Sequence, residues 1–212
     1  WLIENDKYYN FCISYKDYET YKRDGANVDK LLVCPNGAQH RDYHFTEKPL
    51  KPSWTLYLGR IEPRKRQYLY QDIYGVEFVG KYTDTTSFDR NRDCYLGQWE
   101  HEYKLQHVTD YGNMMLLSDG ENGTPLVIKE ALVAGLGVVV SKYAAHDLDT
   151  SLPFVTVIPD DKWEDIEYVQ MKLIENRKIS VTMRKEIRQY GVDNFSWQKL
   201  VKTYVENIEG ME

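Results

Sequence analysis

The sequence predicts an α/β protein, a three-layer α/β/α sandwich in which helices cover both faces of a mostly parallel sheet. Two observations predict this fold. Short apolar runs alternate along the chain with longer amphipathic segments, which is typical of successive strand–helix–strand units. The 212 residues, 42% hydrophobic and 28% charged, also suffice for one domain or for one domain with a small appendage.

The first part of the chain predicts an entry segment before the regular pattern. Residues 9–14 (YNFCIS) are a candidate strand, and Ser14 is a suitable N-cap for a helix that stops at Gly25. A second short strand is expected at 30–34, followed by a Pro-Asn-Gly turn. Residues 38–53 contain two prolines and no periodicity, so we expect an irregular connection there.

The regular alternation then begins and predicts six strands, at 55–61, 76–82, 94–99, 113–118, 137–142 and 154–159. Helices are expected at 64–72, 101–111 and 124–135, and the polar run 83–93 is expected to be a surface loop. The last of these helices has clear ends. Thr124 suits the N-cap, Pro125 suits the first helical position, and Gly135 follows the final turn.

The last part of the chain is predicted to be helical, because its apolar residues recur at helical spacing. The stripes are Ile166, Val169, Leu173 and Ile174; Met183, Ile187 and Tyr190; and Trp197, Leu200, Val201, Tyr204, Val205 and Ile208, with Ser196 as a cap. We expect Trp197 and Tyr204 to serve helix packing rather than ligand binding.

Composition excludes several classes of protein. The net charge of −6 disfavours general nucleic-acid binding, which depends on a basic surface. The longest apolar run, LVAGLGVVV, is too short for a membrane span, and no signal peptide opens the chain. Three cysteines without a close pair indicate a reducing compartment, so we expect a cytoplasmic protein. The start at Trp1 suggests a trimmed chain or a mature fragment.

Two loops at the predicted carboxyl ends of strands contain candidate functional residues, and ligands of open parallel sheets bind at that edge. The first is Gly59–Lys65, in which Gly59 lets the chain turn closely while Arg60 and Lys65 supply cations. A guanidinium and an ammonium suit the oxygens of a diphosphate. On charge alone, a solvated basic turn is the favoured alternative.

The second loop, Asp119–Pro125, runs into the predicted helix that carries Glu130. Glycines before a helix N-terminus expose backbone N–H groups at the positive end of the helix dipole, which favours anions. Carboxylates beside such a site accept hydrogen bonds from the vicinal hydroxyls of a sugar or ribose. A plain helix cap with acidic neighbours is the alternative. Together, the two loops match the donor site of an enzyme that uses nucleotide sugars.

These segments carry a family resemblance. GRIEPRK (59–65) and, about sixty residues later, GENGTPLVIKEALVAGLGVVVS (120–141) resemble the C-terminal domain of the retaining GT-B glycosyltransferases of the large group-1 family. LVCPNG (32–37) resembles that family's interdomain connection, and NFSWQKLVKTYVENI (194–208) its last helix. The resemblance covers nearly the whole chain.

The resemblance implies a role for each matching residue. Arg60 and Lys65 match the pair that grips the donor's pyrophosphate, Gly123 and Thr124 match the loop that meets the diphosphate and the sugar, and Glu130 matches the glutamate that holds the ribose. The base of the nucleotide is expected near Gln98 and Trp99. The implied catalytic groups are Arg60, Lys65 and Glu121, and the implied donor-binding set is Gly59, Arg60, Lys65, Glu121, Asn122, Gly123, Thr124, Pro125, Leu126 and Glu130.

The chain departs from the family at one position. The first glutamate of the family's paired-glutamate motif is expected at 122, where this sequence has Asn122, with Glu121 one position earlier. Two explanations stay open. Either the loop holds an extra residue and Glu121 reaches the sugar, or Asn122 has taken the role as a neutral hydrogen-bonding group.

No cofactor or metal is expected, because two side-chain cations and a helix N-terminus would stabilise the leaving diphosphate. Asp147 and Asp149 have the D-x-D spacing that binds divalent ions in a different glycosyltransferase fold, a spacing common by chance. His40 and His44 lack partners for a zinc set and are expected at the surface. Motifs of hydrolase elbows, dinucleotide sites and phosphate-binding P-loops do not occur.

The leading hypothesis is the donor-binding half of a glycosyltransferase that transfers sugar from a nucleotide diphosphate to an unknown acceptor. Residues 1–53 would be the end of an N-terminal domain and the interdomain connection, 54–195 a Rossmann-like nucleotide-sugar-binding domain, and 196–212 a C-terminal helix. The missing N-terminal acceptor domain would be its partner, so the chain alone would be inactive or weak. The alternatives are a non-catalytic nucleotide- or partner-binding module and a GT-B-fold sugar-nucleotide epimerase. Nothing in the sequence indicates a membrane-docking surface.

Overall fold

The computed structural model describes residues 7–83 and 87–210 and contains the predicted parallel sheet. Its five strands follow the order β4-β3-β5-β6-β7, and all neighbours are parallel. The strands are β3 (Lys51–Leu58), β4 (Val76–Val79), β5 (Tyr111–Leu116), β6 (Gly137–Ser141) and β7 (Val155–Ile158). Every residue of β4, β5 and β6 is buried, which is expected of a sheet covered on both faces.

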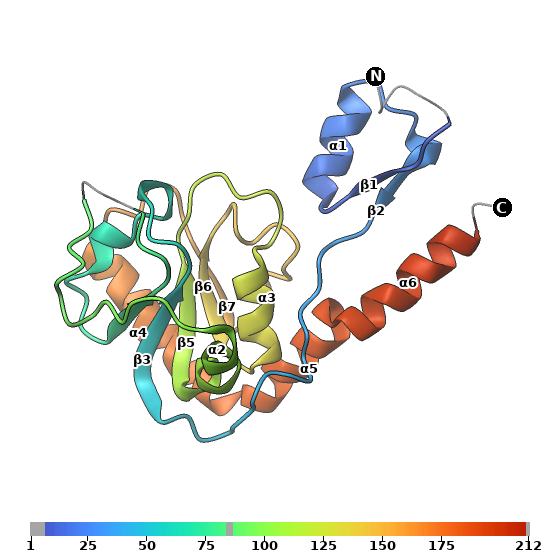
Figure 1. Cartoon of the computed structure of the whole chain (residues 1–212). Helices are drawn as coiled ribbons and strands as arrows, with labels where there is room; N and C mark the ends of the chain where they lie inside the picture. Colours follow the sequence, from blue (N-terminus) through green and yellow to red (C-terminus); the bar gives the residue numbers. More distant parts are fainter. Residues whose placement is uncertain (1–6, 84–86, 211–212) are drawn as a thin grey trace.

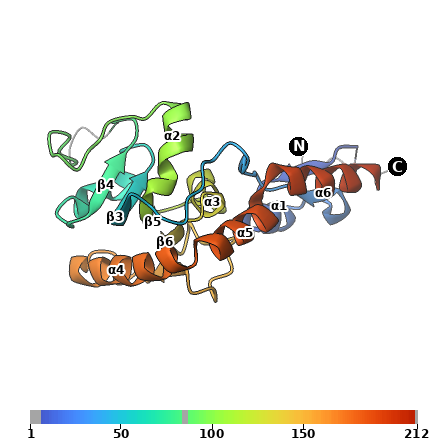
Figure 2. The ribbon, with the colours of Figure 1, turned by 90° about the horizontal axis from the view of Figure 1, so that it is seen from below.

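Helices cover both faces, which confirms the predicted sandwich (Figures 1 and 2). On one face lie α2 (His101–His107) and α3 (Leu126–Val133), and on the other lies α4 (Ile166–Thr182). The last two helices, α5 (Arg184–Phe195) and α6 (Trp197–Glu209), confirm that the end of the chain is helical. Helix α5 packs against α3, whereas α6 projects from the body (Figure 1).

Polar side chains inside the core fix α4 on the sheet. The Asn113 amide on β5 donates to the Asn176 side chain on α4 (2.9 Å), and the Asn176 amide donates to backbone carbonyls of both β6 and the segment before β7. Both asparagines are fully buried. Buried amides that are bonded in this way define one register for the helix, because any slip leaves them without partners.

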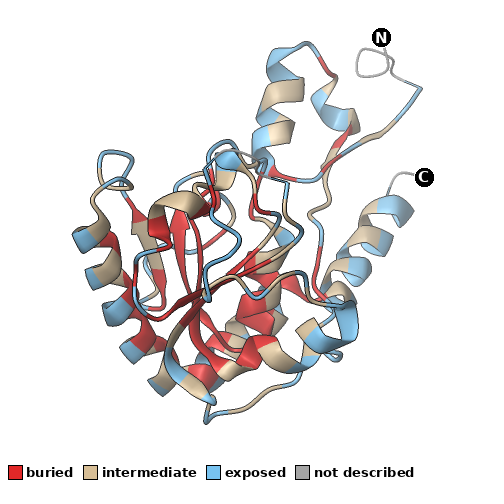
Figure 3. Cartoon of the chain, turned by 60° about the vertical axis from the view of Figure 1, so that its left-hand side comes forward, coloured by how far each residue is buried: buried red, intermediate tan, exposed pale blue. Residues whose placement is uncertain are grey.

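The N-terminal part forms a separate small unit of strand, helix and strand (Figure 1). Strands β1 (Asn10–Cys12) and β2 (Leu31–Val33) pair in parallel, and α1 (Tyr15–Arg23) connects them. Ser14 caps α1 as predicted, its hydroxyl accepting from the Asp17 amide. The buried core of this unit consists of Cys12, Ala26 and Leu31. Figure 3 shows that this unit and α6 contain few buried residues compared with the sheet.

The connection between the two parts is anchored at the Pro-Asn-Gly turn. A Cβ on Gly37 would lie 2.9 Å from Leu200 Cδ1 and 3.0 Å from the Phe195 carbonyl oxygen, so only glycine fits against α6 there. The Tyr204 hydroxyl donates to the Pro35 carbonyl, and the Lys129 ammonium donates to the Asn36 carbonyl (3.0 Å). Tyr204 therefore serves packing, as predicted.

The predicted strand at 94–99 is wrong as a regular strand. This run lies beside β4 and forms one isolated bridge, between Phe78 and Tyr95, before Gly97 turns the backbone at φ 75°. A left-handed residue cannot continue an extended ladder, so the run ends as an irregular edge.

The predicted helix at 64–72 is also wrong. The chain forms two short 3₁₀ turns, Pro63–Lys65 and Gln67–Tyr70, separated by Arg66 at φ 56°. The cause is the buried Gln67 side chain, which donates to the Arg60 carbonyl (2.8 Å) and accepts from the Glu62 amide (3.3 Å). These bonds fold the loop back on itself instead of releasing it into an α-helix.

Several predicted boundaries differ by a few residues: the strand predicted at 113–118 is Tyr111–Leu116, that at 76–82 ends at Val79, and the helix predicted at 101–111 ends at His107. Strand β3 begins at Lys51, earlier than the predicted 55, and includes Pro52. Helix α3 begins at Leu126 with Pro125 in the cap position, so the predicted cap at Thr124 is one residue too early. The Thr124 hydroxyl instead accepts from the Asp147 amide (3.1 Å). Within the described ranges, no helix is both long and apolar enough to cross a membrane.

Candidate functional site

The carboxyl ends of β3 and β4 approach each other through two glycines. Gly59 follows β3 and Gly80 follows β4, and a Cβ on Gly80 would overlap the Gly59 carbonyl. A Cβ on Gly59 would lie 2.9 Å from the Lys65 ammonium nitrogen. Gly59 therefore allows the Lys65 amine to lie directly against the backbone at the end of the strand, as the sequence suggested for a closely turning loop.

Tyr57 connects this loop to the end of β5. Its ring is fully buried, its hydroxyl donates to the Lys65 carbonyl, and the same oxygen accepts from the Leu117 amide (3.1 Å). Burial raises the pKa of Tyr57 well above its ordinary value, so the hydroxyl remains protonated and can keep both bonds. One side chain thus fixes the loop after β3 relative to the loop after β5.

Arg64 joins the same two loops by charge. Its guanidinium lies 3.1 Å from a carboxylate oxygen of Glu121 and 3.1 Å from one of Glu62. The Arg64 carbonyl also accepts from the Asp119 amide (3.0 Å). Arg64 was not predicted as a site residue, although it is the first residue of the dense basic cluster Arg64-Lys65-Arg66.

Lys65 and Arg60 have different environments. Burial lowers the pKa of Lys65, and the carboxylates of Glu121 and Glu62 oppose this shift. Lys65 is therefore an ammonium held within the electrostatic reach of Glu121. The Arg60 side chain is 63% exposed and lies 3.9 Å from Glu62. The structure brings Lys65 to the second loop and leaves Arg60 turned toward solvent beside Glu62.

The loop at 121–123 is in contact with the N-terminal unit. The Lys16 ammonium on α1 donates to the Glu121 carbonyl (3.2 Å) and to the side-chain oxygen of Asn122 (3.3 Å). Gly123 has φ 81°, and a Cβ there would lie 2.8 Å from the Ser14 Cβ. The start of α1 therefore lies directly against this loop, a contact that local sequence patterns do not predict.

The start of α3 is held by a reciprocal pair. The Thr124 amide donates to the Asp147 carboxylate (3.1 Å), and the Asp147 amide donates to the Thr124 hydroxyl (3.1 Å). The Asp147 carboxylate therefore lies just before α3, near the positive end of the helix dipole, where a negative charge is stabilising. Leu126, the first residue of α3, has a half-exposed side chain. The structure thus places Thr124, Pro125 and Leu126 together at the helix N-terminus.

Glu130 lies one turn into α3 and faces α2. Its Oε1 is 2.8 Å from the Lys104 ammonium, and its Oε2 is buried without a hydrogen bond among the residues described. The buried Tyr43 hydroxyl is close by, and burial together with the Glu130 charge raises the pKa of Tyr43. Glu130 is therefore a largely buried carboxylate between the Lys104 ammonium and the Tyr43 hydroxyl.

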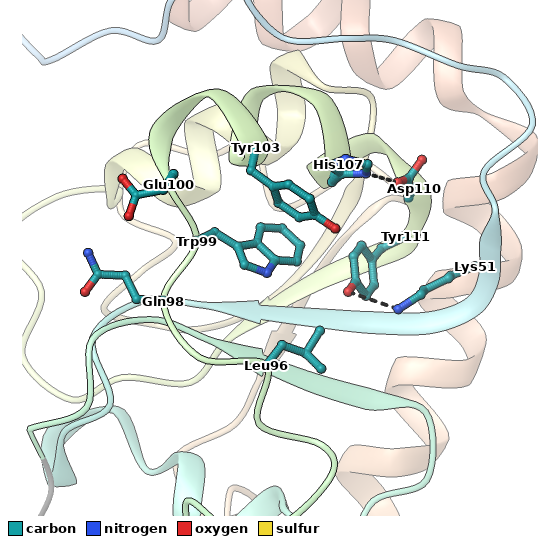
Figure 4. Close-up of a pocket in the computed structure, with 9 residues that line it drawn as sticks. All are labelled: Lys51, Leu96, Gln98, Trp99, Glu100, Tyr103, His107, Asp110 and Tyr111. Carbon is teal, nitrogen blue, oxygen red and sulfur yellow. Dashed lines mark hydrogen bonds and ion pairs between the residues drawn. The ribbon is translucent and has the colours of Figure 1, made fainter.

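A hollow of about 490 Å³ lies between α2 and the sheet (Figure 4). In it, the Trp99 ring is 5.1 Å from the Tyr103 ring and 6.2 Å from the Tyr111 ring, while Gln98 lies at the rim. Lys51 and Tyr111, which begin β3 and β5, line its far end. The hollow therefore extends from the expected base position toward the amino edge of the sheet. It does not include Arg60, Lys65 or the loop at 121–124.

The two aspartates and the two histidines that the sequence offered as metal ligands have separate partners and environments. Asp147 bonds to Thr124, whereas Asp149 accepts from the Ser151 hydroxyl (2.6 Å). His44 is exposed and His40 is half-buried. Among residues 7–83 and 87–210, no three histidine, cysteine or acidic side chains are grouped as metal ligands. The three cysteines are free thiols.

No protein-family model and no curated protein matches the chain. Its structural neighbours are GT-B glycosyltransferases, and the chain has the fold of the C-terminal domain of that class. Anabaena HepE in complex with UDP is 13% identical over 94% of this chain and 63% of HepE, with a TM-score of 0.75. Sucrose-phosphate synthase from Thermosynechococcus elongatus is 16% identical over 99% of this chain and 59% of the synthase, with a TM-score of 0.73.

A third similar structure is the lipopolysaccharide outer core galactosyltransferase WaaB, 17% identical over 96% of this chain and 62% of WaaB, with a TM-score of 0.71. At these identities the likeness establishes the fold. The chain spans about 60% of the length of these structures. The predicted resemblance to GT-B glycosyltransferases is therefore confirmed.

Proposed function

We propose that this chain is the donor-binding half of a retaining glycosyltransferase that uses a nucleotide-diphosphate sugar. One observation carries the proposal: the loop after β3, with Lys65, and the loop after β5, with the start of α3, are fastened together by Tyr57 and Arg64 at the carboxyl edge of the sheet. That edge is where open parallel sheets bind ligands. HepE, of the same fold, has been solved in complex with UDP and with UDP-glucose.

Each group at this edge has a chemical task in the proposed reaction. When the bond between sugar and diphosphate breaks, negative charge develops on the diphosphate, and Lys65, Arg60 and the N-terminus of α3 stabilise it. Positive charge develops on the sugar, and the Glu121 carboxylate and nearby carbonyls favour it. These side-chain cations supply the charge that a metal ion supplies elsewhere, so the proposed reaction uses no metal.

The nucleoside would extend from the diphosphate toward α2. The Glu130 carboxylate, which pairs with Lys104, would accept from a ribose hydroxyl, the role that the family resemblance implies. Gln98 and Trp99 would flank the base where the hollow of Figure 4 opens.

We further propose that an N-terminal acceptor-binding half completes the active site. The N-terminal unit buries few residues of its own and exposes Phe11, Ile13 and Tyr15, while α6 exposes Val201, Val205 and Ile208. Exposed apolar faces of this kind are typical of interfaces. The chain alone would then bind donor weakly and turn over little. The three free thiols support a reducing location, the cytoplasm.

Calorimetric titration of the chain with UDP, GDP and their sugars tests the donor site. We expect one of the two nucleotides to bind, and Arg60→Ala to weaken its affinity about tenfold, the effect of one lost charge-assisted contact. Arg23→Ala, an exposed arginine beside Asp24 at the far end of α1, is the matched control and should leave affinity unchanged. Equal affinities of the Arg60→Ala variant and the wild type would contradict the assigned role of Arg60.

A non-catalytic module of the same fold is the second candidate. It is favoured by Asn122, which replaces an acidic group of the resembled family, and by the engagement of Glu121 with Arg64. The absence of binding by any nucleotide or nucleotide sugar would favour the module. Binding of UDP or GDP with dependence on Lys65 would favour the donor site.

A further inference from the structure

Lys16 gives the 121–123 loop a positive charge that its own residues do not supply. It is the second residue of α1, it is exposed, and its ammonium crosses to the Glu121 carbonyl and the Asn122 side-chain oxygen. Ser14, the cap of the same helix, lies against Gly123. The start of α1 is therefore part of the wall around this loop, together with the N-terminal end of α3.

Among the described residues, the two bonds of Lys16 leave its charge without a counterion. Both acceptors are neutral oxygens, at 3.2 and 3.3 Å, the long end of the range for an ammonium donor. No carboxylate within the described part of the chain forms an ion pair with Lys16. The carboxylate on the contacted loop, that of Glu121, pairs with Arg64 and is only 15% exposed.

The residue at position 122 also favours a negatively charged ligand group. An acidic side chain there would repel an anionic sugar and would neutralise Lys16, whereas the Asn122 amide does neither. Its amide nitrogen also offers two hydrogen-bond donors to a carboxylate. Lys16 and Asn122 together thus form a paired cation and amide, a combination suited to a carboxylate group.

We propose that the donor sugar carries a carboxylate, as in a nucleotide-linked uronic acid, and that Lys16 and Asn122 bind that group. The inference rests on the proposed function, since it is the donor site that puts the sugar at the 121–123 loop. Lys65 and Arg60 are assigned to the two phosphates. A carboxylate on the sugar would be a third anionic group, and Lys16 is the additional cation that would bind it. A neutral hexose leaves Lys16 with its two weak bonds and gains nothing from its charge.

Calorimetry on the 212-residue chain tests this preference. The probes are UDP, UDP-glucose and UDP-glucuronate, with GDP, GDP-mannose and GDP-mannuronate as the second series. We expect the uronate to bind about tenfold more tightly than the matching hexose, the effect of one charge-assisted contact. The preference should shrink as salt rises, because Lys16 is exposed.

Three variants test whether Lys16 and Asn122 cause the preference for the uronate. Lys16→Met should bring the uronate to the affinity of the hexose while leaving binding of UDP or GDP unchanged, and Asn122→Glu should abolish or reverse the preference. Lys22→Met, at the other end of α1 beside Glu19, is the matched control and should behave as wild type. Circular dichroism and thermal unfolding verify that each variant is folded.

The outcomes separate the two proposals. Nucleotide binding with equal affinity for uronate and hexose overturns the inference and leaves the proposed function standing. A preference for uronate that survives Lys16→Met also overturns it. Failure of every nucleotide to bind overturns the donor site itself, and the inference with it.

Discussion

The Arg64 guanidinium lies 3.1 Å from a carboxylate oxygen of Glu121, which joins the loop after β3 to the loop after β5 by a direct ion pair. The two residues are separated by β4, α2 and β5 in the chain. This pair, with the Tyr57 bonds beneath it, defines the spacing between the Lys65 ammonium and the start of α3. The donor site depends on this spacing, because a diphosphate must contact both sides.

Replacing Arg64 with methionine should therefore affect binding more than stability. The Arg64 side chain is 45% exposed, so the loss of its pairs should cost about 1 kcal/mol or less of folding free energy. Nucleotide affinity should nevertheless fall, because Glu121 becomes a free carboxylate next to the diphosphate position. Calorimetry and urea unfolding of the same variant measure the two effects. Unchanged affinity would show that the loop spacing does not depend on the pair.

Gly37 provides a test of how the connection is anchored. Gly37→Ala places a methyl group 2.9 Å from Leu200 Cδ1 and 3.0 Å from the Phe195 carbonyl oxygen, so the Leu200 side chain and the neighbouring backbone must move. We expect a loss of about 1–3 kcal/mol in unfolding free energy, as for other overpacked sites. Gly210→Ala is the control, since its nearest contact is 3.4 Å and its φ is −74°. Equal stabilities of the two variants would rule out this tight contact.

The sheet could be predicted from the sequence because burial on both faces leaves continuous apolar runs, such as 137–141, that local pattern detects. The predicted helix at 64–72 failed because the conformation is decided by the Gln67 side chain, which bonds to backbone groups of the preceding loop. Side-chain bonds of this kind, to backbone groups seven and five residues earlier, override the helix propensity of the individual residues.

The site could be predicted only in part. The two loops could be identified from the sequence alone, because their glycines and charged residues directly follow predicted strands. The pairing of Arg64 with Glu121 and of Lys16 with Asn122 could not be predicted, because each joins segments that are distant in sequence. Charge type alone does not say which of three consecutive basic residues, 64–66, faces which carboxylate.

The lowered pKa of Lys65 predicts that donor binding changes with pH in the alkaline range. Burial lowers its pKa below the ordinary 10.5, so the ammonium loses its proton at a lower pH than an exposed lysine. The unfolded chain then binds this proton more tightly than the folded one. The contribution of Lys65 to stability therefore rises with pH between the lowered pKa and 10.5. Nucleotide affinity should move the opposite way and fall in this window, because the diphosphate needs the charged amine.

Lys65→Arg separates this effect from the titration of other groups, since guanidinium stays charged throughout the window. We expect the affinity of the wild type for UDP or GDP to fall as pH rises toward 10.5, and that of the variant to stay level. Titrations at several pH values measure both. Parallel pH profiles for the two proteins would remove Lys65 from the diphosphate contact.

Asp147 and Asp149 allow the structural and the metal-binding interpretations of the D-x-D spacing to be compared. Asp147 accepts from the Thr124 amide at the start of α3, whereas Asp149 accepts from Ser151 in its own exposed loop. Asp147→Ala should cost about 1 kcal/mol of unfolding free energy, because it removes a part-buried hydrogen bond to the Thr124 amide. Asp149→Ala should have little effect, and EDTA or Mn²⁺ should leave nucleotide affinity unchanged. If both variants instead lost nucleotide affinity equally, and only when Mn²⁺ was present, the two carboxylates would be ligands of one ion, and Lys65 and Arg60 would no longer suffice to hold the diphosphate.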